Sequence, residues 1–172
     1  MKFFKIISIS LLMIGTFSQS HFSFAESRSS ESYKVLNDEN DKLSVKNVQS
    51  FIEEGDRLID NGKFEDAKDS YDKGRNLAKQ LSGFYRDLNG AFRGLDARIP
   101  REMEDKGRKS LKAWADANGR LAALYKRKNQ PEVAVPLLVE IIKLMSPSSP
   151  EGKAAFRDLR ELGFVETSYQ GY

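Results

Sequence analysis

Residues 51–74, FIEEGDRLIDNGKFEDAKDSYDKG, carry the pattern from which the fold of this chain can be predicted. Bulky and small residues alternate in it at helical spacing on both sides of Asn61-Gly62, a pair typical of the end of a helix. Gly74 costs about 1 kcal/mol of helix propensity relative to alanine, so we expect it to mark a close approach between two helices. Two amphipathic segments joined by such a turn form a helical hairpin.

The order of residues in this hairpin resembles the tetratricopeptide repeat (TPR). The resemblance is carried by Gly55 and Leu58 in the first helix, Gly62 at the turn, and Phe64, Ala67 and Tyr71 in the second helix. Glu54 departs from the pattern, because an apolar residue is expected there. A TPR-like array implies a binding scaffold in which the first helix of each pair lines most of the groove.

A second hairpin, at residues 121–145, repeats the order of the first. Leu58 corresponds to Tyr125 and Ala67 to Ala134, and both pairs are 67 residues apart, close to two repeats of about 34 residues. This agreement in phase at two hairpins strengthens the resemblance.

The block between the two hairpins follows the pattern less well. The resemblance covers residues 48–79 and 118–147, and residues 82–118 only as a degenerate pair of helices. Arg98 and Arg101 stand where the repeat would place a turn aromatic and a small residue.

Three further breaks complete the predicted helices. We expect Ser82-Gly83 to end the second helix, Pro100 to begin a helix that runs to about Lys128, and Pro131 to begin the next one. A last helix is predicted over residues 151–162. The fold class is therefore all-α: a short TPR-like α-α superhelix of about three helical hairpins plus a terminal helix.

The N-terminus has the pattern of a signal peptide, residues 1–25. Lys2 and Lys5 precede an apolar run over residues 6–17, and Ser23-Phe24-Ala25 fits a signal-peptidase site. The run is too short for a comfortable membrane span, and a retained N-terminal anchor is the alternative. We expect an exported protein, in a periplasm or thylakoid lumen or outside the cell. The segment PEVAVPLLVEIIKLMSPSSPEG resembles exported cyanobacterial repeat proteins, which implies the first two compartments.

The remaining chain divides into three predicted regions. Residues 26–46 are polar and are expected to form a disordered spacer, residues 47–163 the TPR-like helical domain, and residues 164–172 a loosely held tail. Removal of residues 1–25 would lower the net charge from +3 to +1, because that segment holds two lysines and no acidic residue.

The residue inventory excludes several kinds of catalytic and metal site. The chain has no cysteine, and its one histidine, His21, lies in the predicted signal peptide. A mature chain without both cannot build a zinc finger, a Cys/His nucleophile pair or a Ser-His-Asp triad. Carboxylates remain as acid–base candidates for a hydrolase, namely Glu53, Glu54, Asp69 and Asp72. The favoured interpretation is a solvated acidic face, and we predict no enzymatic activity, cofactor or metal.

Basic residues gather in residues 82–130, which hold twelve Lys/Arg against six Asp/Glu. Such a surface can attract an anionic membrane, a polyanion or an acidic protein segment, although it can equally be ordinary surface charge. Nucleic acid is not expected, because aromatic residues are not interleaved with the charges and the chain carries an export signal. The basic-face candidates are Arg101, Arg108, Lys109, Lys112, Arg127 and Lys128.

The predicted function is an exported, non-enzymatic scaffold that binds a protein or peptide partner. One role consistent with this prediction is the assembly of an envelope or lumenal complex. The alternative is a helical assembly factor whose basic face touches an anionic membrane or polyanion. Asn and Arg side chains on first helices can hydrogen-bond a peptide backbone or carboxylate. The groove candidates are Arg57, Asn61, Arg86, Asn89, Arg93, Asn118 and Lys126. Trp114 is expected to anchor the core.

Overall fold

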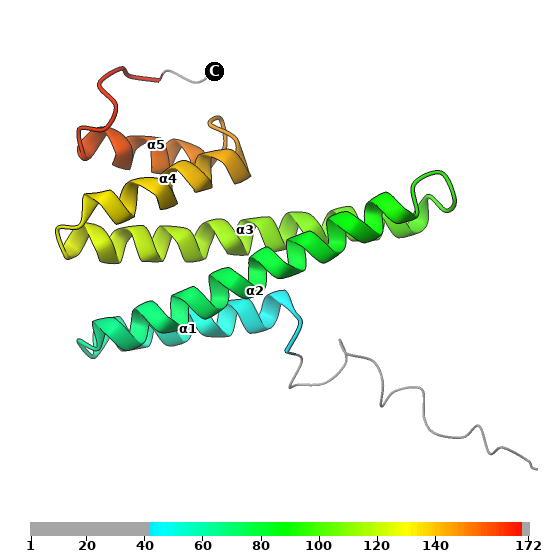
Figure 1. The fold of residues 1–172 in the computed structure, drawn as a ribbon, viewed down its shortest axis with the longest axis horizontal. Helices are drawn as coiled ribbons and strands as arrows, with labels where there is room; N and C mark the ends of the chain where they lie inside the picture. Colours follow the sequence, from blue (N-terminus) through cyan, green and yellow to red (C-terminus); the bar gives the residue numbers. More distant parts are fainter. Residues whose placement is uncertain (1–41, 170–172) are drawn as a thin grey trace, which may run out of the picture. The chain divides into compact units, whose positions relative to one another are not determined.

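The computed structural model describes residues 42–169, which lie within one compact unit of the chain. These residues form five α-helices and no β-strand, which confirms the all-α prediction (Figure 1). The helices are α1 (Val45–Asp60), α2 (Phe64–Ala91), α3 (Arg98–Arg127), α4 (Pro131–Met145) and α5 (Pro150–Glu161). The predicted signal peptide and residues 26–41 of the predicted spacer lie outside the described residues, whereas residues 45 and 46 of that spacer belong to α1.

The first and last helices begin at serine caps. The Ser44 side chain accepts a hydrogen bond from the Asn47 amide at 3.1 Å, and the Ser149 side chain accepts one from the Gly152 amide at 2.9 Å. Each serine satisfies an amide that the first turn of a helix leaves without a partner. No helix in residues 42–169 is both long enough and apolar enough to cross a membrane.

The helices α1, α3 and α5 end with the same backbone motif. Gly62, Asn129 and Gly163 follow these helices with positive φ values of 73°, 54° and 73°. The next amide in each case donates to the carbonyl five residues earlier: Lys63 to Leu58, Gln130 to Tyr125 and Phe164 to Leu159. This is the Schellman motif. Its occurrences are separated by 67 and then 34 positions, and the first of these equals the offset between Leu58 and Tyr125 in the sequence.

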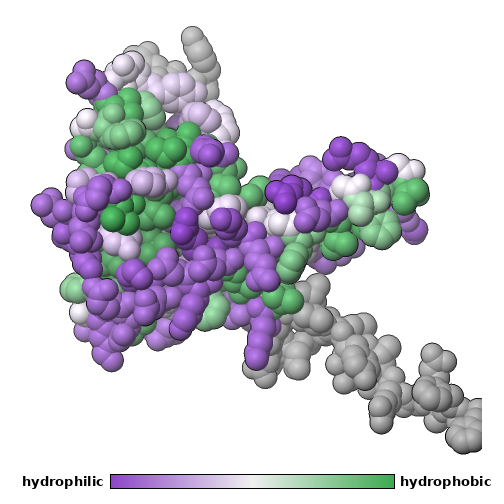
Figure 2. Space-filling view, in the orientation of Figure 1, coloured by the Kyte–Doolittle hydropathy of each residue, from purple (hydrophilic) through white to green (hydrophobic). Residues whose placement is uncertain are grey.

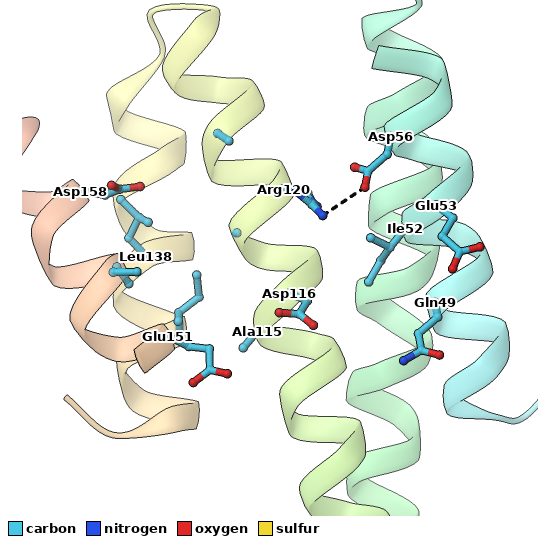
Figure 3. Close-up of a pocket in the computed structure, with 15 residues that line it drawn as sticks. Gln49, Ile52, Glu53, Asp56, Ala115, Asp116, Arg120, Leu138, Glu151 and Asp158 are labelled. Atoms are coloured by element: carbon cyan, nitrogen blue, oxygen red, sulfur yellow. Dashed lines mark ion pairs between the residues drawn. The ribbon is translucent and has the colours of Figure 1, made fainter. Parts of the chain in front are cut away.

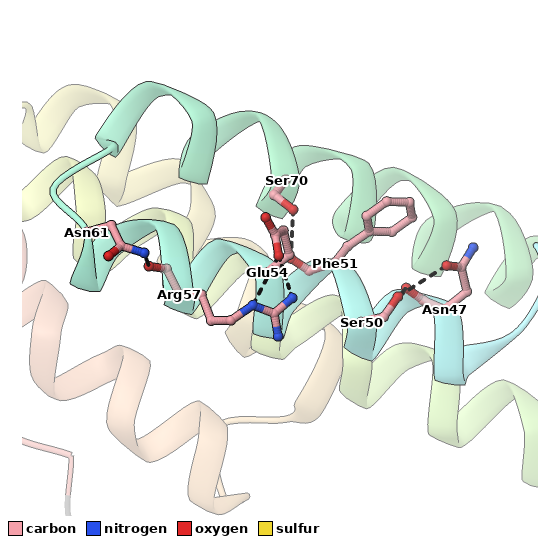
Figure 4. Close-up of polar contacts among 7 residues, drawn as sticks. All are labelled: Asn47, Ser50, Phe51, Glu54, Arg57, Asn61 and Ser70. Atoms are coloured by element: carbon pink, nitrogen blue, oxygen red, sulfur yellow. Dashed lines mark hydrogen bonds and ion pairs between the residues drawn. The ribbon is translucent and has the colours of Figure 1, made fainter.

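The α1–α2 hairpin packs through small residues, as predicted. A Cβ atom on Gly74 would lie 3.3 Å from the Val48 carbonyl oxygen, so the two helix backbones approach closely there. Ser70 of α2 donates to the Phe51 carbonyl oxygen of α1 at 2.9 Å (Figure 4). The core continues through α3, α4 and α5, where Leu121 and Leu138 are among the largest buried side chains.

The predicted break at Ser82-Gly83 is wrong, because α2 runs through it. The Ser82 hydroxyl donates to the Lys79 carbonyl at 2.8 Å within the helix, and Gly83 does not take a positive φ. One glycine costs a helix about 1 kcal/mol, which tertiary packing along α2 can offset. The predicted start at Pro100 also moves, because α3 begins at Arg98 and Pro100 lies in its first turn, where its missing N–H costs nothing.

The middle block therefore does not form a hairpin of its own. Its first half continues α2 and its second half continues α3, and the two helices run antiparallel to a shared loop (Figure 1). This end of the α2–α3 hairpin extends beyond α1, α4 and α5. Phe84, Leu88 and Leu95 are exposed on this part of the hairpin. Figure 2 shows apolar surface at the projecting end.

Candidate functional site

A groove of about 610 Å³ lies between α1, α3 and α5, with α4 beneath it (Figure 3). Its apolar floor contains Ile52 of α1 together with Leu138 and Ile141 of α4. Ala115 of α3 and Ala155 of α5 also line the groove, and their small side chains leave space between the two helices. The groove can therefore receive side chains from another molecule against an apolar base.

The walls of this groove are acidic. Five carboxylates and one cation line it, and α1, α3 and α5 all contribute. The carboxylates are Glu53, Asp56, Asp116, Glu151 and Asp158, and the cation is Arg120. The sequence predicted cationic and amide side chains for the groove, so its charge is opposite to the expected one.

One of the wall carboxylates, Asp56, is fixed by neighbours from two helices. Tyr71 of α2 donates its hydroxyl hydrogen to Asp56 Oδ1 at 2.6 Å, and Arg120 of α3 lies 3.1 Å from Asp56 Oδ2. Burial raises the pKa of Tyr71, and the hydrogen bond to Asp56 raises it further, so the tyrosine stays a donor. Asp56 therefore links α1 to α2 and α3. Because both of its carboxylate oxygens already have partners, Asp56 is a weaker site for a ligand cation than an unpaired carboxylate.

The two carboxylates of α5 have lysine partners at the rim. Glu151 lies 3.5 Å from Lys112, and Asp158 lies 3.2 Å from Lys126. Burial lowers the pKa of Lys126, but its contacts with Glu161 and Asp158 outweigh the effect and raise it overall. Both pairs tie α5 to α3.

Asp116 and Glu53 have no ion pair with any described residue, and both face the groove (Figure 3). Much of the Asp116 side chain is exposed, yet surrounding protein atoms partly desolvate its carboxyl and raise its pKa. Lys112 opposes this shift, Glu151 adds to it and Arg120 opposes it. A cation entering the groove would relieve the cost of ionising Asp116.

The groove candidates from the sequence do not line this groove. Arg57 pairs with Glu54 on another face of α1, and the Asn61 side chain donates to the Arg57 carbonyl at 2.8 Å at the end of that helix (Figure 4). Lys126 binds α5 as described above. Arg57 and Asn61 therefore make contacts within α1 and its C-terminal end, and Lys126 joins α3 to α5.

Three more candidates belong to the far end of the α2–α3 hairpin. Arg86 pairs with its neighbour Asp87 at 3.2 Å, and Asn89 donates to the Pro100 carbonyl at 2.8 Å. Arg93 lies in the loop, 3.4 Å from the Asn89 side-chain oxygen. These three residues therefore lie away from the groove. Their contact with a ligand stays a prediction.

Asn118 is fully buried in a polar network that joins α2, α3 and α4. Its Nδ2 donates to Glu140 Oε2 at 2.8 Å, and Arg75 Nη2 donates to the same oxygen at 2.9 Å. Burial alone would raise the pKa of Glu140, but these two hydrogen bonds outweigh it and lower the pKa. Trp114 packs against the core as expected, and Lys79 lies 5.6 Å from its ring centroid.

Three of the six basic-face candidates pair with acids. Arg108 contacts Glu104 and Asp105, Lys112 contacts Glu151, and Lys128 lies 2.6 Å from Glu65. Three candidates are exposed and have no ion pair within residues 42–169, namely Arg101, Lys109 and Arg127. Local pairing therefore reduces the positive field that the composition suggests.

The 67-residue recurrence in the sequence also relates the groove-lining residues of α1 to those of α3. Gln49, Ile52, Glu53 and Asp56 of α1 line the groove, and the residues 67 positions later do so as well. Those residues of α3 are Asp116, Gly119, Arg120 and Ala123. Carrying the 67-residue offset from the core positions to their neighbours on the same helix face would have located both walls.

Comparison with known proteins does not identify the groove, so its function is inferred from the residues that line it. No family model, curated protein or solved structure matches the chain. Within the described part of the chain, no group of three His, Cys, Asp or Glu side chains is arranged to hold a metal ion.

Proposed function

We propose that this chain is an exported, non-enzymatic, TPR-like scaffold whose groove binds a basic segment of a partner protein. The observation that carries the proposal is the groove itself, in which an apolar floor lies between walls with four more carboxylates than cations. A segment with both Lys or Arg and apolar side chains would satisfy the two kinds of surface at once.

The arrangement of helices supports the TPR-like interpretation. Helices α1, α3 and α5 form the walls of the groove and share one C-terminal motif, whereas α4 contributes only to its floor and α2 does not line it. Ala67 and Ala134, which the resemblance pairs with each other, are both completely buried. The export proposal rests on the signal-peptide pattern of residues 1–25.

Two side chains supply the specificity that we propose. Asp116 and Glu53 come from facing helices, and neither has an ion pair within the described part of the chain (Figure 3). The raised pKa of Asp116 reports a carboxylate in an unfavourable environment. A lysine or arginine of the partner would replace lost solvation at this carboxylate and add a hydrogen bond.

The alternatives have less support from the structure. Of the predicted hydrolase carboxylates, Glu54 pairs with Arg57, Asp69 and Asp72 pair with Lys68, and only Glu53 faces the groove. They do not converge as a catalytic carboxylate pair must. Membrane attraction by the basic face is weakened by the ion pairs of Arg108, Lys112 and Lys128.

The test is peptide binding measured by fluorescence anisotropy. The probe is a labelled peptide of alternating lysine and leucine, compared with peptides in which glutamate replaces lysine or serine replaces leucine. We expect only the first to bind the full chain well, and Asp116→Lys to weaken its binding about tenfold.

Asp60→Lys is the matched control, because Asp60 is exposed on α1 and does not line the groove. Equal affinity for the lysine and glutamate peptides, or equal loss from Asp116→Lys and Asp60→Lys, would contradict the proposed groove.

A further inference from the structure

We infer that the partner of the acidic groove is a second copy of this chain, whose α2–α3 loop, residues 92–97, docks into it. The inference rests on the proposed function of the groove and names its occupant. Two separate surfaces of the same molecule carry it: the groove between α1, α3 and α5, and the far end of the α2–α3 hairpin (Figures 1 and 3).

The loop presents an apolar side chain on an ordered turn. Leu95 is 79% exposed, the highest value among the exposed large hydrophobic residues of residues 42–169. The Leu95 and Asp96 amides both donate to the Phe92 carbonyl, at 3.1 and 3.3 Å, and Gly94 supplies the positive φ of 85° that the turn needs. A leucine held out by such a turn leaves water at little entropic cost when it is covered.

The same loop carries a cation without an acidic partner. Asp96 is neutralised by Arg98, whose side chain and then whose backbone amide hydrogen-bond its carboxyl and lower its pKa. Arg93 has only a 3.4 Å contact with the neutral Asn89 amide and no ion pair with a described residue. The loop therefore offers Leu95 together with the free charge of Arg93.

Loop and groove are complementary in both respects. Leu95 matches the floor of Ile52 and Leu138, and Arg93 matches the unpaired carboxylate of Asp116. The groove is too small for a pair of helices but admits a few side chains of a loop. A bilayer would satisfy the apolar side chains of the loop as well, but it would leave the acidic groove without an occupant.

The loop cannot fill the groove of its own chain. Asp116 lies 18 residues along α3 from Arg98, where the loop ends, which corresponds to roughly 27 Å of continuous helix. The docked loop must therefore come from another copy. Because the loop and the groove are different surfaces, the contact either repeats head to tail, as a ring or an open chain, or is made twice about a two-fold axis in a dimer.

The hairpin flank adds apolar area beside the loop. Phe84 and Leu88 are 45% and 44% exposed on α2, close to the loop in the sequence, and their four-residue spacing places them on one face of the helix. A neighbouring copy that receives the loop would also cover part of this flank. Such burial would stabilise a contact that two charges alone could not hold.

The experiment is sedimentation velocity of the full chain over micromolar to millimolar concentrations at low salt. We expect self-association whose dissociation constant rises about tenfold in Arg93→Glu and in Asp116→Lys. A mixture of these two variants should associate again with about the wild-type constant, because the Arg93 loop of one meets the Asp116 groove of the other. Lys109→Glu is the matched control and should behave as wild type, because Lys109 is exposed and belongs to neither surface.

The possible outcomes separate the two proposals. A monomer at every concentration that still binds the lysine–leucine peptide would overturn self-docking and leave the groove function intact. An unchanged dissociation constant in both Arg93→Glu and Asp116→Lys would also overturn self-docking. So would a mixture of the two variants that does not associate. So would a monomer that binds vesicles of anionic phospholipid and loses this binding in Arg93→Glu, because the occupied surface would then be a lipid headgroup layer.

Discussion

At the scale of single residues, Gly55 of α1 leaves the space that the ring of Tyr71 of α2 occupies. A Cβ atom at this position would lie 2.3 Å from Cε1 and 2.8 Å from Cζ of Tyr71. The Tyr71 ring has little freedom to move away, because its hydroxyl group is hydrogen-bonded to Asp56 on the groove wall. One small residue thus sets the spacing of two helices and the position of a groove carboxylate.

We therefore expect Gly55→Ala to lower the free energy of unfolding by about 2 kcal/mol, the typical cost of overpacking a core. Gly83→Ala is the matched control, since a Cβ there meets nothing within 4 Å in the interior of α2. It should raise the free energy of unfolding by about 1 kcal/mol through helix propensity. Urea unfolding followed by circular dichroism measures both, and equal effects of the two changes would contradict the contact at Tyr71.

At the scale of helices, Glu140 joins three elements through one carboxylate. Arg75 of α2 and Asn118 of α3 both donate to its Oε2 atom. Arg75 Nε, Trp114 Nε1 and Asn118 Oδ1 are buried nearby without hydrogen-bond partners among the described residues. The Glu140 carboxylate therefore accepts hydrogen bonds from Arg75 and Asn118 in a network where other buried polar atoms have no partner, so its loss would be costly.

We expect Glu140→Gln to lower the free energy of unfolding by about 2 kcal/mol at neutral pH, because two hydrogen bonds lose their charged acceptor. The folded pKa of Glu140 lies below its ordinary value of 4.5. The carboxylate thus stabilises the fold above pH 4.5, and this contribution is lost as the pH falls through the lowered folded pKa.

Urea unfolding from pH 7 down to pH 3 checks this prediction. The gap between wild type and Glu140→Gln should narrow below about pH 4.5. Glu132→Gln on the same helix is the control, since its exposed side chain should change stability by only about 0.5 kcal/mol. A gap that stays constant with pH would show that the charge of Glu140 is not the cause.

At the scale of the whole described unit, the two ends of the α2–α3 hairpin differ in their surroundings. The buried residues of α3 from Ala113 to Leu124 pack into the core with α4 and α5, while Phe84, Leu88 and Leu95 at the other end remain exposed. Fewer apolar contacts make local opening cheaper. The hairpin end that we propose as a docking element is thus also the part with least support.

Hydrogen exchange should reveal this difference. We expect amides of residues 84–91 to exchange about 100-fold faster than those of residues 117–124, because local opening at the hairpin end requires less free energy. Mass spectrometry on the wild-type chain measures both segments at once. If the inference of self-docking is right, protection at residues 84–91 should increase with protein concentration, whereas uniform protection at all concentrations would contradict it.

Part of the fold could be predicted from particular residues. Asn61-Gly62, Asn129-Gln130-Pro131 and Pro150 end or begin helices because glycine or asparagine takes positive φ and proline fixes the first turn. Gly74 marked a close helix contact correctly. Ser82-Gly83 misled, because the same residue types stay helical when neither takes positive φ and the flanking apolar pattern continues.

The candidate site was harder to predict than the fold. The seven groove candidates were chosen from hydrogen-bonding ability and an assumed hairpin phase, and none lines the groove. Asn118 shows the reason, because it lies on α3 beside Asp116 but points into the core at zero exposure. A rotation of about 200° separates residues two positions apart on a helix, so a small error in phase exchanges core and groove.

The turns that end α1 and α3 and the 67-residue recurrence could be read from the sequence, because they depend on local backbone preferences and on the spacing of apolar side chains. The long α2–α3 hairpin of the middle block and the acidic charge of the groove became apparent only in the folded chain. Both depend on which helix faces meet. Ion pairs such as Lys128–Glu65 and Lys112–Glu151 join residues far apart in the chain, so the charge left over for a partner is fixed only when the helices pack.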